Sequence, residues 1–164
     1  MNRLSTIAAI ALLCLGISLP GAVFAQTAKE YVGTWALISS DTVRSDGSRV
    51  PTFGGKATGI LIFGSDGRFV YLFSRAELPK FASNNRNTGT PEENAAVVKG
   101  SIATYGTYSV ADKVFTIRIE HSTFPNWIGA EQTRTITAIG DEMKWSNPAG
   151  SGGGVVELVL KRVK

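Results

Sequence analysis

This sequence is poor in chemically reactive side chains. Its 164 residues include one cysteine and one histidine. The cysteine, Cys14, falls within an apolar N-terminal stretch, so the rest of the chain has no thiol for a disulfide or a thiolate nucleophile. A single histidine without cysteine partners leaves too few ligands for a zinc site. We therefore expect no metal and no cofactor, and a fold that depends on its apolar core.

Clusters of basic residues and long apolar runs are also scarce. The formal net charge is +4, but the lysines and arginines are scattered along the chain. Nucleic-acid binding usually needs them gathered in a patch or stripe. After residue 25 no apolar run reaches the roughly 20 residues that a membrane-spanning helix needs. We expect neither a nucleic-acid partner nor a stable membrane span, and the oligomeric state stays open.

The N-terminus has the layout of a secretory signal peptide. A short basic start, Met1–Arg3, precedes the apolar run Ile7–Leu19, and a Val-Phe-Ala tripeptide ends at Ala25. Small or apolar residues at these last positions are typical of a cleavage site. We predict cleavage after Ala25 and a periplasmic or secreted protein. Residues 1–25 are then a leader and residues 26–164 form a single domain, a length typical of one domain.

Short β-prone segments separated by turn residues dominate the rest of the chain. Gly64–Gly67, for example, is a strong hairpin signal. Consecutive strands with such turns favour an antiparallel meander, and closing it into a barrel removes the exposed edges. The expected fold is all-β, an eight-stranded up-and-down barrel whose interior either is filled or holds one small ligand. The expected strands are 31–43, 58–63, 68–74, 105–110, 114–121, 131–139, 142–146 and 155–163.

One helix is expected between the third and fourth of these strands. Thr90-Pro91-Glu92-Glu93 is a capping box with proline at the first helical position. Ala95, Val98 and Ile102 then recur at helical spacing, which predicts about three turns. The strand over 68–74 is apolar on both faces, so we expect this helix to cover its outer side.

A series of motifs runs in order along residues 30 to 163. It comprises Tyr31–Leu37 with Gly33-Thr34-Trp35, Gly59–Ile62 with Asp66-Gly67, Thr90–Glu93, Tyr105–Tyr108 and His121–Arg134. Together these stretches resemble the bacterial and fungal lipocalin-like domain proteins, a family of calycin-type β-barrels. The resemblance implies that Trp35 closes one end of the barrel and that Arg162, near the end of the last strand, lies over its ring. The resemblance implies no particular activity and no particular catalytic residues.

Alternation along residues 114–121 places His121 on the same face as three apolar residues. With aromatic residues of other strands, this face predicts either the lining of a cavity or a filled core. His121 at the strand end is either a proton carrier or polar anchor inside the barrel, or a residue that fixes the following loop. The residues on these faces are Tyr71, Phe73, Tyr108, Phe115, Ile117, Ile119 and His121.

Arg134 and an aromatic loop complete the candidate site. Gln132 and Arg134 share a face, and a charge that points into the barrel needs a partner. That partner is either the carboxylate of a ligand or an internal salt bridge or carbonyl. Phe124 and Trp127 belong to the loop before this strand, which either contributes to a binding site or closes the barrel end.

The leading functional hypothesis is an exported barrel that binds a small hydrophobic molecule, with or without a carboxylate, in its interior. One alternative is an isomerase or cyclase for a hydrophobic substrate, with His121 as the catalytic residue facing the cavity. A lone histidine without a fixed partner seldom makes a catalytic site, so this alternative is less favoured. The other alternative is a non-catalytic interaction or inhibitor domain, with a filled barrel and an exposed apolar patch around Phe124–Trp127.

Overall fold

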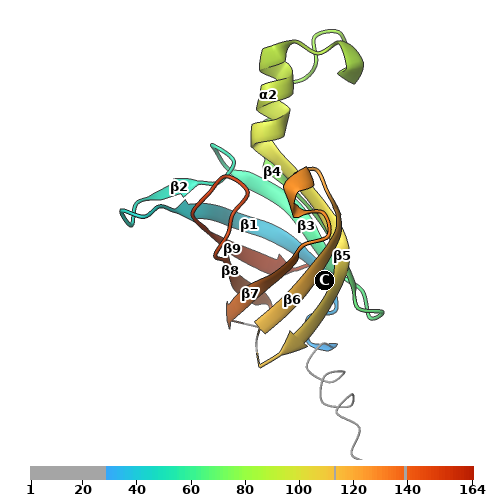
Figure 1. Ribbon diagram of the computed structural model, residues 1–164, viewed down its shortest axis with the longest axis vertical. Helices are drawn as coiled ribbons and strands as arrows, with labels where there is room; N and C mark the ends of the chain where they lie inside the picture. The colour runs from blue at the N-terminus through green and yellow to red at the C-terminus, as the bar shows by residue number, and fades with distance from the viewer. Residues whose placement is uncertain (1–28, 113, 139) are drawn as a thin grey trace, which may run out of the picture.

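A closed β-barrel forms the body of the protein. The computed structural model describes residues 29–112, 114–138 and 140–164, so the predicted leader lies outside the described residues. Over the described part, nine strands form one antiparallel sheet in which β1 also pairs with β9 (Figure 1). The strands are β1 (Gly33–Val43), β2 (Arg49–Pro51), β3 (Ala57–Phe63), β4 (Arg68–Arg75), β5 (Ser101–Ala111), β6 (Val114–Ser122), β7 (Glu131–Ala138), β8 (Glu142–Asn147) and β9 (Val155–Arg162).

The connectivity confirms the predicted eight-stranded up-and-down barrel. From β3 onward each strand pairs with the next in the sequence, and β1 joins β3 to β9. The short strand β2 adds to this barrel by pairing with the C-terminal end of β1, from Asp41 to Val43. Closure leaves the eight main strands with partners on both sides, which removes the open edges that favour aggregation.

Trp35 lies buried near one end of the barrel, where the family resemblance places it. The indole is fully buried and donates from Nε1 to the carbonyl of Tyr31 at 2.8 Å. The Arg162 guanidinium lies 4.2 Å from the centre of the ring, and it also donates to the carbonyls of Val32 and Glu30. A stacked guanidinium contributes about 0.5–2 kcal/mol. The predicted contact between Arg162 and Trp35 is therefore confirmed.

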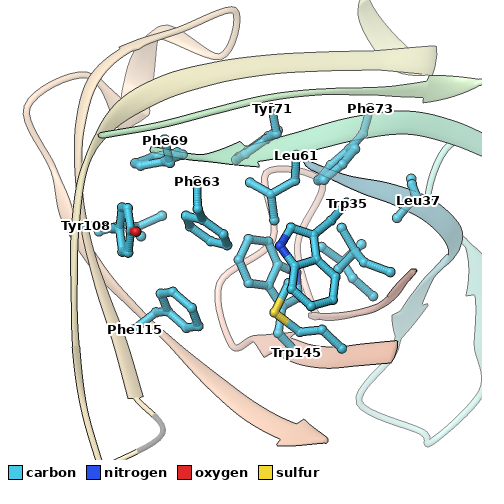
Figure 2. Close-up of a cluster of buried hydrophobic side chains, with 14 of the residues drawn as sticks. Trp35, Leu37, Leu61, Phe63, Phe69, Tyr71, Phe73, Tyr108, Phe115 and Trp145 are labelled. Atoms are coloured by element: carbon cyan, nitrogen blue, oxygen red, sulfur yellow. The ribbon is translucent and has the colours of Figure 1, made fainter. Parts of the chain in front are cut away.

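Aromatic side chains fill the barrel above this plug. Phe63 stacks on Phe115 with ring centres 4.9 Å apart, and it contacts Tyr108 at 4.6 Å. Trp145 meets Phe63 edge-on at 6.3 Å (Figure 2). Such pairs contribute beyond the area that they bury. This part of the barrel is a packed core.

A β-bulge changes which residues of β1 point inward. Leu37 pairs with Leu160 and Ser39 with Val159, so Ile38 is an extra residue in the strand. Inward-facing positions are odd-numbered before the bulge, at Leu37, and even-numbered after it, at Ser40. A bulge inserts one residue and thereby reverses the alternation that follows. Ser40 consequently faces the barrel interior.

A second bulge, in β6, has the same effect near the open end. Tyr105 pairs with His121 but the next residue, Gly106, pairs with Ile119, which leaves Glu120 as the extra residue. His121 is therefore exposed, although plain alternation assigns it to the face of Ile119. Gly106 permits the distortion, because a Cβ there would lie 1.9 Å from the carbonyl oxygen of Arg118.

The helix α2 (Pro91–Gly100) lies between β4 and β5, where it was predicted. Its capping box is formed, because Thr90 Oγ1 accepts from the Glu93 amide and Glu93 Oε2 accepts from the Thr90 amide. The short 3₁₀ helix η1 (Arg86–Thr88) precedes it. Ile102 belongs to β5 rather than to the last turn of the helix, since β5 begins directly after Gly100.

The expectation that this helix covers the outer side of β4 is wrong. The helix projects away from the barrel (Figure 1), and Val70 and Leu72 remain 45% and 53% exposed on the outer face of β4. The reason is that α2 runs directly into β5 without a loop between them. The helix therefore cannot fold back onto the outer face of the sheet. The helix stands at the open end of the barrel instead.

Candidate functional site

Two adjoining hollows occupy the open end of the barrel. The outer one is a cleft of about 1170 Å³ between α2, the hairpin of β1 and β2, and the loop over residues 148–154. The inner one is a pocket of about 50 Å³. The two adjoin because both are lined by Thr52, Phe53, Ile102 and Ser151.

Arg134 on β7 brings a buried positive charge to the inner pocket. It is 3% exposed, and its guanidinium donates to the carbonyl of Thr133 at 3.0 Å and to the side-chain oxygen of Gln132. No ion pair joins it to a carboxylate in the described part of the chain. Burial lowers the pKa of Arg134 to about 10, and the nearby Tyr71 opposes this shift. A guanidinium has five N–H donors, so the site retains donor capacity.

Two further donors in this pocket have no hydrogen-bond partner. They are the hydroxyl of Ser40 on β1 and the indole Nε1 of Trp145 on β8, and both residues are 3% exposed. Leaving a buried donor unsatisfied costs about 1–3 kcal/mol. Together with Arg134 they form a group of donors from three different strands. Such an arrangement suits a ligand with acceptor oxygens.

Four of the predicted site residues, together with Arg134, line these hollows. Tyr71, Phe73 and Trp127 line the inner pocket, and Phe124 lines the outer cleft. Burial raises the pKa of Tyr71, while Thr104 and the charge of Arg134 lower it less. Tyr71 therefore stays a neutral hydroxyl at physiological pH.

The aromatic loop lies over the mouth. Its Phe124 and Trp127 rings meet edge-on at 5.5 Å and pack partly buried against the core, with Trp127 in the 3₁₀ helix η2 (Pro125–Trp127). The Arg134 guanidinium lies 6.0 Å from the Trp127 ring. Ser122 anchors the loop, because its hydroxyl accepts from the Phe124 amide at 3.0 Å. Through these two rings the loop lines both hollows.

The remaining predicted lining residues lie elsewhere. Tyr108, Phe115, Ile117 and Ile119 belong to the packed core and line neither hollow. His121 is exposed on the outer face, where its ring stacks on Tyr105 at 5.9 Å. The burial of Tyr108, Phe115, Ile117 and Ile119 matches the filled-core alternative for that part of the barrel.

Sequence reasoning missed Ser40, Phe53 and Trp145. Alternation along β8 could have found Trp145, because Met143 and Trp145 are both buried at every second position of that strand. No comparable signal exists for Ser40, whose inward orientation depends on the bulge at Ile38. Phe53 follows the short strand β2, which the sequence analysis did not predict.

The described residues contain neither a candidate metal site nor a candidate membrane-spanning helix. No group of three or more histidine, cysteine or acidic side chains there is placed to hold a metal ion. No helix in the same residues is long and apolar enough to cross a bilayer.

Comparison with known proteins yields a family and several structural neighbours. A family model described as a lipocalin-like domain matches residues 32–162 of this chain. Among solved structures, the chain is similar to a lipocalin-like protein from Bacteroides uniformis, with a TM-score of 0.46 and 13% sequence identity. That similarity covers 82% of this chain and 99% of the other. No curated protein matches this chain significantly.

Proposed function

This chain belongs to the family of lipocalin-like domains, and from that premise we propose that it binds a small amphipathic acid at the open end of its barrel. The acidic group lies in the inner pocket at Arg134, and the apolar body lies in the outer cleft. The observation that carries the proposal is a buried arginine without a carboxylate partner in the described residues, beside two unpartnered donors.

The inner pocket suits an acidic group in size and in chemistry. Its volume of about 50 Å³ admits a few heavy atoms at most. Arg134, Ser40 and Trp145 offer donors around it, and a carboxylate accepts from several donors at once. Hydrogen bonds to a charged partner are roughly twice as strong as neutral ones. A bound carboxylate would supply the charge that a buried arginine requires.

The outer cleft suits the rest of such a molecule. Its volume of about 1170 Å³ lies slightly above the ~300–1,000 Å³ that is common for small-molecule sites. Phe53, Ile102 and Phe124 give it apolar surface next to the inner pocket. Because aromatic side chains fill the deep interior, this proposal places the ligand at the mouth instead of among Phe115, Ile117 and Ile119 as the sequence suggested.

The two alternative functions gain less support. An isomerase or cyclase that uses His121 needs this residue to face the cavity, but His121 lies on the outer face. An interaction domain that docks through Phe124 and Trp127 needs both rings exposed, but both pack partly buried against the core.

A direct test is native mass spectrometry of the protein purified from its own host, where we expect a co-purifying acid of low mass. Titration followed by tryptophan fluorescence then compares dodecanoate with dodecanol. We expect the acid to bind more tightly, because the alcohol leaves Arg134 without a counter-charge. Breaking one partner of a buried charged contact costs about 2–5 kcal/mol, so Arg134→Met should weaken dodecanoate binding at least about thirtyfold.

The matched control is Arg118→Met, which removes an exposed arginine of β6 outside both hollows. It should leave dodecanoate binding unchanged. Thermal unfolding checks that both variants are folded. Equal affinity of the wild type for acid and alcohol, or equal loss of dodecanoate affinity in the two variants, would contradict the role of Arg134.

We also propose that the protein is exported, which rests on the signal-peptide layout of residues 1–25. N-terminal sequencing of the protein from its host should give Gln26 as the first residue. A mature protein that still begins at Met1 would contradict export by this route.

A further inference from the structure

The hollows at the open end are lined by charges of one sign. Arg44, Arg75 and Lys99 line the outer cleft, and Arg134 lines the inner pocket. No aspartate or glutamate lines either hollow in the described residues. A cleft lined by one sign of charge attracts ligands of the opposite sign. The positive lining extends beyond what a single acidic group at Arg134 requires.

The three cations of the outer cleft also have no ion-pair partner among the residues that the structure describes. The ion pairs between described residues use Arg49, Arg68, Lys144 and Lys164, all of which lie outside the cleft. Those four basic residues are neutralised in pairs, whereas Arg44, Arg75 and Lys99, like the exposed Arg118 and Lys161, are in no ion pair between described residues. Their charges remain available to a ligand.

Arg75 is held in place at the edge of the cleft. It is the last residue of β4 and is half-buried, and its Nε donates to the carbonyl of Glu77 at 3.1 Å. Its side chain passes close to Gly55 and Gly100, where an added Cβ would lie 3.3 Å and 3.9 Å from it. Lys99 directly precedes Gly100, the last residue of α2. Because the Arg75 side chain passes close to Gly100, Arg75 and Lys99 lie on neighbouring parts of the cleft wall. A side chain that is already ordered loses less entropy when it binds.

We propose that Arg75 and Lys99, with Arg44 on the β1–β2 hairpin, form a second anion-binding subsite. The ligand is then an elongated molecule with an acidic group at each end and an apolar middle. One acidic group binds Arg134, the middle lies against Phe53 and Ile102, and the other acidic group binds the cations of the cleft. This inference rests on the proposed function, because it extends the same site outward.

The test compares a monoacid with diacids of increasing length. Dodecanoate, dodecanedioate and hexadecanedioate are titrated into the full-length protein, with tryptophan fluorescence as the signal and calorimetry as the check. We expect at least one diacid to bind about tenfold more tightly than dodecanoate, since one additional charged contact commonly has that effect. The gain should shrink as salt is raised, because the outer subsite is open to solvent.

Two double variants locate the subsite. Arg75→Gln with Lys99→Gln should remove the advantage of the diacid and leave dodecanoate affinity within about twofold of the wild type. Arg118→Gln with Lys161→Gln removes the same charge from exposed positions outside the cleft and should leave the advantage intact. Equal loss in both double variants would mean that only overall charge matters and would overturn the subsite.

The possible failures are distinguishable. If dodecanoate binds in an Arg134-dependent way but no diacid binds more tightly, the second subsite is wrong and the proposed function stands. If neither the monoacid nor any diacid binds, both are wrong. If the advantage of the diacid survives Arg75→Gln with Lys99→Gln, the second acidic group binds elsewhere and this assignment is wrong.

Discussion

Each end of the barrel places an arginine beside a tryptophan, but the two pairs differ in how closely they stack. At the closed end the Arg162 guanidinium lies 4.2 Å from the Trp35 ring and donates to two carbonyls. At the open end the Arg134 guanidinium lies 6.0 Å from the Trp127 ring, with Ser40 and Trp145 unpartnered nearby. Arg134 also donates to two protein oxygens, so the ends differ in the looser ring contact and in the two unpartnered donors at the open end.

Register shifts occur at both ends of the barrel, including one between Ile136 and Ala138 of β7 near the closed end, but those towards the mouth bring polar groups inward. Around Phe63 and Phe115 the strands alternate without interruption, and large side chains interlock. Towards the mouth, bulges at Ile38 and Glu120 reverse the alternation and bring polar groups inward at Ser40 and Ser122. Bulges are common near binding sites because they redirect side chains. The bulges towards the mouth thus place polar side chains in the interior, whereas aromatic side chains fill it near the closed end.

The largest expected effect is the loss of the closed-end plug. Trp35→Ala should lower the free energy of unfolding by about 3–5 kcal/mol, because it empties a fully buried site and leaves Arg162 without its stacking partner. Trp127→Ala at the mouth should cost clearly less, since that ring is only partly buried. Urea unfolding followed by circular dichroism measures both. Equal losses would show that the mouth is as much a part of the stabilising core as the plug.

An intermediate effect is expected at the bulge of β6. Gly106→Ala should destabilise the barrel by about 1–3 kcal/mol, because its new Cβ would collide with the Arg118 carbonyl oxygen. Gly152→Ala is the matched control, as a Cβ there meets nothing within 4 Å. Urea unfolding of both variants gives the comparison. If the two substitutions lower the free energy of unfolding equally, the bulge does not require a glycine at position 106.

The smallest effect is expected in the helix beside the mouth. Thr90→Ala removes one half of the capping box and should cost about 1 kcal/mol of helix stability. Because α2 projects from the barrel, amide hydrogen exchange should accelerate in α2 while the urea midpoint of the barrel stays unchanged. Thr88→Ala, just before the cap, should leave exchange in α2 unaltered. A lower barrel midpoint for Thr90→Ala would show that helix and barrel unfold as one unit.

Much of this fold could be predicted because its signals are local. The capping box at Thr90 fixes where α2 begins, and the turn at Gly64–Gly67 fixes the hairpin between β3 and β4. The site was less predictable. Arg134 was recognised because a charge on its strand that points into the barrel needs a partner, whereas Ser40 was missed and His121 was assigned to the inner face. The orientations of Ser40 and His121 each depend on one extra residue in a strand, and alternation alone does not reveal such a residue.

By itself the sequence determined the eight main strands, their order and the closed barrel, because these follow from the period of apolar residues and from nearby turns. The stacking of Arg162 on Trp35 was implied by the family resemblance. Only the tertiary structure decided where the interior is filled, which way His121 and Ser40 point, and that α2 leaves the outer face of β4 bare. These features depend on the register between strands and on the lack of a loop at Gly100. Register reflects contacts between residues far apart in the chain, so no local pattern specifies it.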